Sequence, residues 1–135
     1  MYQGMYRGSC LCGAVNYEID GPLGDIIHCH CSRCRKVNGT AFATNSPVAE
    51  KDFRITKGQE SLRSFDTEAG THRVFCSGCG SPIISKRDSI PGVVRVRIGT
   101  LDTPLDARST AHMYVGSKAE WFEIHDDLPQ FAERP

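Results

Sequence analysis

Short runs of alternating apolar and polar residues recur along the chain, separated by turns rich in glycine, proline and aspartate. The clearest run is residues 93–98, in which three apolar side chains point one way and Arg95 and Arg97 point the other. This alternation predicts a strand in a sheet with one face in water. Similar runs predict further strands at residues 14–19, 25–28, 40–45 with a weaker continuation to 48, 53–56, 62–66, 71–75, 82–86 and 111–115.

Helical signals are few. Residues 32–37 predict one or two helical turns closed by Asn38-Gly39, and Ser117 predicts the cap of a short helix through residues 119–121. Residues 7–13 are typical of a turn. Turns at intervals of roughly 8–12 residues indicate a mainly antiparallel β protein. The length of 135 residues, with no repeat and no linker, predicts one domain over residues 1–135.

Charge and hydropathy narrow the classes of partner. The chain has 16 basic and 16 acidic residues, whereas nucleic-acid binding usually needs a basic surface, so no nucleic-acid partner is expected. No apolar run approaches the ~18 residues of a membrane span, so no membrane partner is expected. Residues 1–7 lack the apolar core of a signal peptide, which favours a cytoplasmic, reducing location. Clustered cysteines in such a compartment are more often metal ligands than disulfides.

Three of the seven cysteines, Cys29, Cys31 and Cys34, fall within six residues. Thiolates are soft ligands that suit Zn²⁺, and a site with three protein ligands leaves a position for water or substrate. This spacing predicts an open zinc site that acts in function. The alternatives are a second structural site, or a site that is empty or oxidised.

His28 and His30 are candidates for a fourth ligand of that site. If the segment is a strand, residues 28 and 30 face away from 29 and 31, and neither imidazole easily reaches the same ion. The expectation fails if the backbone turns at Cys29. Otherwise each histidine is a surface residue or a neighbour of the ligands.

The other four cysteines, Cys10, Cys12, Cys76 and Cys79, form a C-x-C pair and a C-x-x-C pair, each followed by glycine. Two such turns can place four sulfurs around one ion, and glycine allows backbone N–H groups to point at the thiolates. We predict a closed zinc site that joins the first strand to the middle of the sheet. A redox C-x-x-C pair, or buried free thiols, would be the alternative.

The local basic group Arg33, Arg35 and Lys36 follows the three-cysteine spacing. It is either a solvated turn or the counter-charge for an anionic site. Zinc with three thiolates carries a net charge of −1, and a thiolate ligand would raise it to −2. Arginine also grips carboxylates bidentately, so these residues are candidates for substrate binding.

Residues 8–13, residues 29–36 with Gly39, and residues 75–81 resemble the glutathione-dependent formaldehyde-activating enzyme family, which also includes centromere protein V. The tail is similar to the C-terminal pattern of that family, so the resemblance runs from about residue 5 to 131. It implies a mainly β, β-tent-like fold of twisted antiparallel sheets stapled by zinc, with short helical turns. It implies a structural zinc at Cys10, Cys12, Cys76 and Cys79, and a second zinc at Cys29, Cys31 and Cys34 where a thiol binds.

The reaction implied by the resemblance is the condensation of glutathione with formaldehyde to S-(hydroxymethyl)glutathione, the reverse of a carbon–sulfur lyase step. Two classes of function follow. One is a zinc enzyme that acts on a thiol or a thiol adduct. The other is a non-catalytic zinc module that binds a small thiol or a protein partner.

Overall fold

The structure, a computed structural model, describes residues 5–135. Residues 1–4, part of the stretch that lacks a signal-peptide core, lie outside the described residues. The described strands are β1 (Tyr6–Ser9), β2 (Asn16–Ile19), β3 (Ile26–Cys29), β4 (Ala43–Ala49), β5 (Phe53–Lys57), β6 (Leu62–Asp66), β7 (Thr71–Cys76), β8 (Pro82–Arg87), β9 (Val93–Arg97) and β10 (Ser109–Met113). The helices are α1 (Ser32–Asn38) and the short 3₁₀ turns η1 (Glu50–Asp52), η2 (Gln59–Ser61), η3 (Ile98–Thr100) and η4 (Val115–Ser117).

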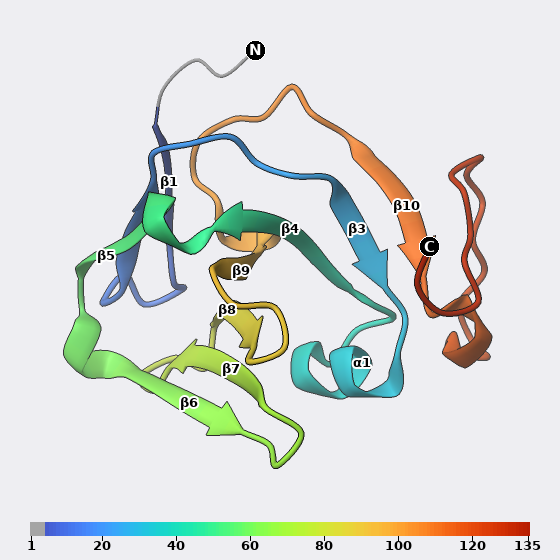
Figure 1. The fold of residues 1–135 in the computed structure, drawn as a ribbon, viewed down its shortest axis with the longest axis horizontal. Helices are drawn as coiled ribbons and strands as arrows, with labels where there is room; N and C mark the ends of the chain where they lie inside the picture. Colours follow the sequence, from blue (N-terminus) through green and yellow to red (C-terminus); the bar gives the residue numbers. More distant parts are fainter. Residues whose placement is uncertain (1–4) are drawn as a thin grey trace.

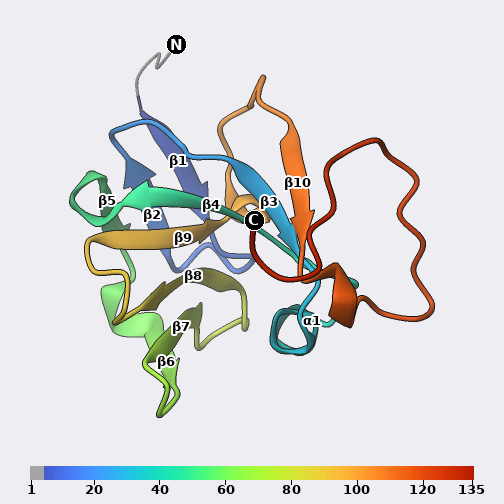
Figure 2. The same ribbon diagram turned by 45° about the vertical axis from the view of Figure 1, so that its right-hand side comes forward.

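The strands form two sheets. A three-stranded sheet has the order β1-β2-β5, and a seven-stranded sheet has the order β10-β3-β4-β9-β8-β7-β6. Figures 1 and 2 show the larger sheet curving strongly from β6 to β10, with α1 below the end of β3 in both views. The predicted mainly β fold is confirmed. No helix in residues 5–135 has the length and apolar character needed to cross a lipid bilayer.

The main core lies between the two sheets. Strand β2 contributes Tyr17 and Ile19, and the larger sheet contributes Ile84, Val94 and Val96, all buried. Burial of apolar side chains at about 25 cal/mol per Å² is the dominant favourable term in such a core. The alternation of β9 therefore directs its valines inward, as the sequence predicts.

A close approach between β1 and β2 explains a glycine. Gly8 pairs with Tyr17, and a Cβ atom at Gly8 would lie 2.2 Å from Cζ of the Tyr17 ring. The Tyr17 hydroxyl and the Thr100 hydroxyl are hydrogen-bonded at 2.6 Å, which ties β2 to η3. Burial raises the pKa of Tyr17 to about 12. Any larger residue at position 8 would displace this buried ring.

The expected mainly antiparallel pairing is confirmed, with β10 and β3 the one parallel pair among the described strands. Three other expectations from the sequence are wrong in detail. Residues 7–9, expected in a turn, belong to β1. The expected helix after Ser117 is absent from the described tail, because η4 ends at Ser117 and turns follow. Finally, the polar face of β9 is not in water throughout, since Arg97 is only 4% exposed.

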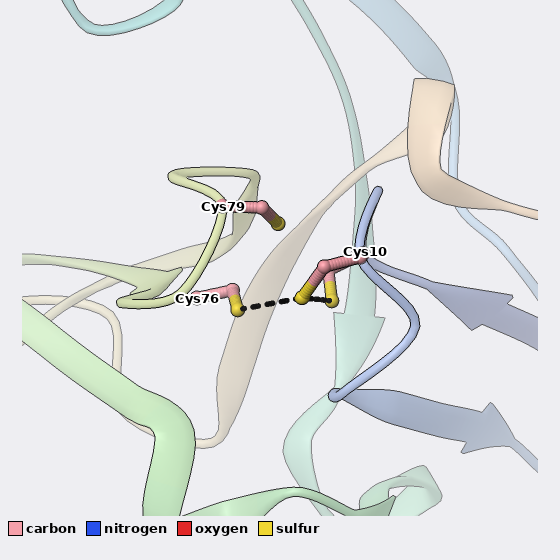
Figure 3. A group of neighbouring side chains, drawn as sticks. Cys10, Cys76 and Cys79 are labelled. Carbon is pink, nitrogen blue, oxygen red and sulfur yellow. Dashed lines mark hydrogen bonds between the residues drawn. The ribbon is translucent and has the colours of Figure 1, made fainter.

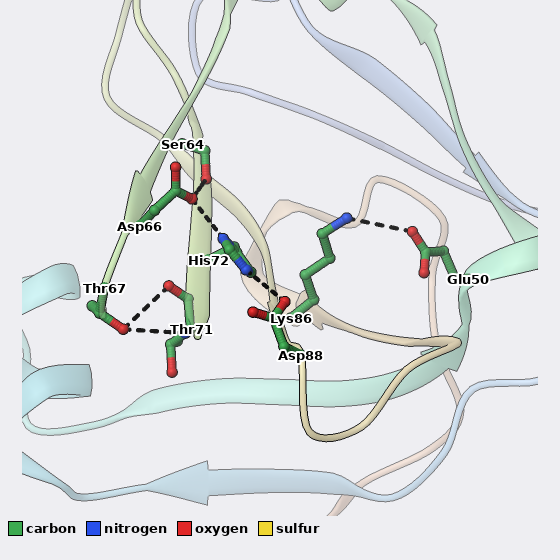
Figure 4. Close-up of polar contacts among 8 residues, drawn as sticks. All are labelled: Glu50, Ser64, Asp66, Thr67, Thr71, His72, Lys86 and Asp88. Atoms are coloured by element: carbon green, nitrogen blue, oxygen red, sulfur yellow. Dashed lines mark hydrogen bonds and ion pairs between the residues drawn. The ribbon is translucent and has the colours of Figure 1, made fainter. Parts of the chain in front are cut away.

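A charged cluster joins β6, β7 and the turn after β8 (Figure 4). The His72 ring nitrogens lie 2.6 Å from Asp66 Oδ1 and 2.8 Å from Asp88 Oδ1. These two carboxylates, Asp66 first, raise the pKa of His72. The protonated imidazole donates to both carboxylates and so holds the hairpin closed.

We expect this cluster to make stability depend on pH. The pKa of His72 is higher in the folded chain than the ordinary value of about 6.5, so its contribution is complete below that pH. The contribution is lost as pH rises through the raised pKa. The fall in thermal midpoint from pH 6 to pH 9 should therefore be smaller in His72→Gln than in the parent. The matched control is His125→Gln, at an exposed histidine beside Glu123 alone. Equal falls in parent and His72→Gln would contradict the assignment.

Candidate metal centres

The four-cysteine cluster forms where the β1–β2 turn meets the turn after β7. The Sγ atoms of Cys10, Cys12, Cys76 and Cys79 all lie within 4.8 Å of one another. Cys10 and Cys12 sulfurs are 3.6 Å apart, and Cys12 and Cys76 sulfurs are 3.8 Å apart. A tetrahedral zinc with Zn–S bonds of about 2.3 Å places its sulfurs about 3.8 Å apart. The cluster therefore fits a metal ion, and its separations are far too long for a disulfide.

The backbone of both turns is shaped by glycine. Gly13 and Gly80, each directly after the second cysteine of its pair, have φ values of +79° and +81°. This left-handed conformation suits glycine. Figure 3 shows the labelled cysteines of both turns pointing into one space.

Ser81 connects the two turns around the sulfurs. Its hydroxyl oxygen accepts the Leu11 N–H at 3.0 Å and lies 3.3 Å from Cys79 Sγ. Hydrogen bonds from the Ser81 hydroxyl and backbone lower the pKa of Cys79 to about 5. The Val15 N–H also donates to Cys10 Sγ at 3.2 Å. Such donors around a thiolate are typical of metal ligands.

The three-cysteine cluster lies at the junction of β3 and α1. The sulfurs of Cys29, Cys31 and Cys34 are within 4.8 Å of one another. Cys29 and Cys34 are 4% and 8% exposed, whereas Cys31 is half-buried. Cys31 is also the N-cap of α1, where its sulfur accepts the Cys34 N–H at 3.4 Å. No other Cys, His, Asp or Glu in residues 5–135 joins this group.

The proximity of the three thiols separates their pKa values. Hydrogen bonds from Cys29 and then Cys34 lower the pKa of Cys31 to about 2, and the contact with Cys31 raises the pKa of Cys29. One thiolate is thus stabilised by two thiols. Full ionisation of all three needs a cation among them, which the cluster could hold.

The two neighbouring histidines point away from the sulfurs. His28 Nδ1 lies 2.8 Å from the Thr44 hydroxyl, and His30 Nε2 lies 2.8 Å from His112 Nδ1. His112 Nε2 in turn lies 3.0 Å from Asp126. Strand β3 ends at Cys29 and Cys31 caps α1, so strand alternation separates His28 from Cys29 but does not extend to Cys31. His30 is fully buried, and burial lowers its pKa to about 4.

The basic group of α1 is mostly in solvent. Arg33 and Lys36 are exposed, and Arg35 is half-buried with a buried Nε that has no hydrogen-bond partner. Two arginines outside α1 also lie near the cluster, which the sequence did not predict. Burial lowers the pKa of Arg95 and of Arg97. The charges of Cys29 and Cys34 oppose this shift at Arg95, and the charge of Cys34 together with a hydrogen bond to it opposes the shift at Arg97. Both were assigned to a wet sheet face, and the sequence does not show what packs over it.

A separate cavity of about 680 Å³ is lined by aromatic side chains that include Phe42 and Phe122. Phe42, just before β4, and Thr44, within it, line the cavity, whereas Ala43 between them packs against the three-cysteine cluster. Successive residues of a strand face opposite sides. Ala43 and Thr44 thus face opposite sides of β4, but Arg97, which also interacts with Cys34, lines the cavity as well.

The sequence profile of the glutathione-dependent formaldehyde-activating enzyme family matches residues 5–117, which include both cysteine clusters. The chain belongs to this family. The resemblance named in the sequence analysis is therefore confirmed. The family description names glutathione and formaldehyde, and the two clusters could hold metal ions.

Two fungal relatives are provisionally named after the family. The protein of Fusarium vanettenii is 24% identical over 129 residues, covering 96% of this chain and 60% of the relative. That of Aspergillus flavus is 25% identical over 125 residues, covering 91% of this chain and 56% of the relative. The chain thus spans little more than half the length of these relatives. A crystal structure of a Rhodobacter sphaeroides protein has a TM-score of 0.63 and 27% identity, covering 74% of this chain and 91% of its own.

Proposed function

We propose that this chain is a zinc-dependent enzyme of the carbon–sulfur lyase type that joins a thiol such as glutathione to formaldehyde. The observation that carries the proposal is the convergence of Cys29, Cys31 and Cys34 with no fourth ligand among the described residues. Cys10, Cys12, Cys76 and Cys79 would hold a second, structural zinc. The family to which the chain belongs supports the choice of substrates.

A zinc ion held by Cys29, Cys31 and Cys34 would supply a coordination position that favours the thiolate form of an incoming thiol. The half-buried Cys31 marks the accessible side of the cluster, and the buried Cys29 and Cys34 exclude water behind it. The substrate sulfur then bonds to the formaldehyde carbon, the carbonyl π bond breaks, and the thiol proton ends on the resulting hydroxyl. Arg33, Arg35 and Lys36 are the candidates of α1 for holding a substrate carboxylate.

A specific observation favours the second class, a thiol-binding module without catalysis. The imidazoles of His28 and His30 turn away from the sulfurs, so neither stands beside the cluster to move the substrate proton. Binding and turnover must therefore be measured separately.

The test uses protein loaded with Co²⁺, whose thiolate charge-transfer absorption reports ligation. We expect millimolar glutathione to change this absorption, and S-methylglutathione, which has no free thiol, to leave it unchanged. NMR of ¹³C-formaldehyde with glutathione should then show S-(hydroxymethyl)glutathione forming faster than without protein. No spectral change would refute the proposal, and a spectral change without faster turnover would favour the binding module.

A further inference from the structure

The register of the larger sheet places Cys29 on the same face as an arginine of β9. Cys29 pairs with Ala43, and Asn45, two residues further along β4, pairs with Arg97. Residues directly opposite in adjacent strands share a face, as do residues two apart along a strand. Cys29 and Arg97 therefore project from one side of the sheet.

Three more arginines project from that side. Arg95 is two residues before Arg97 and pairs with Ser85, and Ser85 pairs with Arg73. Arg87 is two residues after Ser85 on β8. We call Arg73, Arg87, Arg95 and Arg97 the arginine row. The opposite face of the same strands carries Ile84, Val94 and Val96 of the main core.

The arginine row has no acidic partner within residues 5–135. The carboxylates that form ion pairs there bind arginines of the smaller sheet, or Lys86 and the histidines. Arg97 donates from Nη1 to Asn45 Oδ1 at 2.6 Å, but this partner is neutral. The Nε atoms of Arg73 and Arg97 are buried and have no hydrogen-bond partner.

This arrangement is costly without an anion. Guanidinium groups removed from water need a charged or hydrogen-bonded partner. Burial lowers the pKa of Arg95 and of Arg97, and Arg87 and Arg73 add repulsion to the respective groups. The negative charges of Cys29 and Cys34 oppose this lowering of the two pKa values. Zinc with three thiolates has a formal charge of −1, so it compensates one of the four positive charges.

We propose that the arginine row is an anion-binding surface that holds the carboxylates of the thiol ligand beside the three-cysteine cluster. The inference rests on the proposed function for the identity of the ligand. Guanidinium groups bind carboxylates bidentately, and Arg73, Arg87 and Arg95 are only half-buried, so a ligand can reach their guanidinium groups. The row therefore selects an anionic thiol over a neutral one, and it does so in place of Arg33 and Arg35 of α1.

The test compares glutathione with its diethyl ester, which keeps the thiol but has no carboxylate. Calorimetry of the zinc-loaded chain should show the ester binding at least about tenfold more weakly. In Arg95→Gln and in Arg73→Gln, the difference in affinity between glutathione and its ester should shrink to about threefold or less. Arg97 is left intact in this comparison because its hydrogen bond to Asn45 is part of the fold.

Two further variants sharpen the comparison. Arg54→Gln removes an arginine of the smaller sheet that pairs with Glu18, and it should keep the full difference. A double variant, Arg33→Gln with Arg35→Gln, tests the arginines of α1. It should also keep most of the difference in affinity between glutathione and its ester. If this α1 variant abolishes the difference while Arg95→Gln and Arg73→Gln keep it, the arginine row is the wrong surface.

The outcomes separate this inference from the proposed function. S-methylglutathione keeps both carboxylates but cannot ligate metal through a thiolate, so it should still bind weakly and lose binding in Arg95→Gln. If glutathione and its ester bind equally, the inference is overturned while thiol ligation stands. If coenzyme A, but not glutathione, shows binding that depends on Arg95, the surface is anion-binding but phosphate is its ligand, and the carboxylate assignment is overturned.

Discussion

Replacement of Cys76 by serine should remove one metal ion per chain and lower the free energy of unfolding by several kcal/mol. Cys76 is fully buried and sits at the end of β7, and its sulfur lies 3.8 Å from that of Cys12, 64 residues away. Metal binding to such a site is coupled to folding, with a free energy on the order of 10 kcal/mol in small zinc peptides. Serine is a poor zinc ligand, so only three thiolates remain to hold the metal. Metal analysis and urea unfolding of the purified variant measure both effects.

The control is Leu11→Ser in the turn that carries Cys10 and Cys12. Leu11 lies between two of the cysteines, yet its side chain is 87% exposed. Its replacement should leave the metal content unchanged and shift stability by less than about 1 kcal/mol. Removal of metal by a chelator should also bring the parent close to Cys76→Ser. If Cys76→Ser keeps both the parent's metal content and its unfolding midpoint, the cluster is not a structural metal site.

Replacement of Cys31 by serine should have the opposite profile, with the fold retained and thiol binding lost. Its three-cysteine cluster spans one short segment, so a metal there closes only small loops. Serine is also a preferred helix N-cap, and its hydroxyl can accept the Cys34 N–H that the Cys31 sulfur accepts now. We expect a stability change of about 1 kcal/mol or less, loss of one metal ion, and no spectral response to glutathione.

Val37→Ser is the matched variant on the same helix. Val37 is 41% exposed and lies outside the cluster, so this variant should keep both metals and respond to glutathione. Unfolding of Cys31→Ser as severe as that of Cys76→Ser would mean that the two clusters do not divide structural and functional roles. A Cys31→Ser protein that still binds glutathione through cobalt would show that the thiol ligates elsewhere.

Alternation of apolar and polar residues predicted most of the strands, because nearly every strand has one face in the core. It missed β1, a four-residue strand whose glycine lies under the Tyr17 ring. It also could not predict the parallel pairing of β3 with β10, since alternation fixes the two faces of a strand but not the direction of its neighbour. Pairing between strands as far apart in the sequence as β3 and β10 depends on packing of the whole sheet.

Cysteine spacing predicted which sulfurs come together, because ligands two or three residues apart converge through local turns. The arginine row has no such local signal. Arg73, Arg87 and Arg95 lie on three different strands, and only the register brings them to the side of Cys29. For the same reason the contact of His30 with His112 was not predicted, although both residues are fully or almost fully buried.

The separation of Cys12 and Cys76 along the sequence also determines how long the first cysteine pair exists without the second during translation. At translation rates of 5–20 residues per second, the 64 residues between them take about 3 to 13 s to synthesise. During that interval the first turn has emerged, but the sulfurs that complete its cluster do not yet exist. Strand β2 also lacks its neighbour β5 until residue 57 has been added. Cys10 and Cys12 therefore depend on reducing surroundings to remain unoxidised until Cys79 has been synthesised.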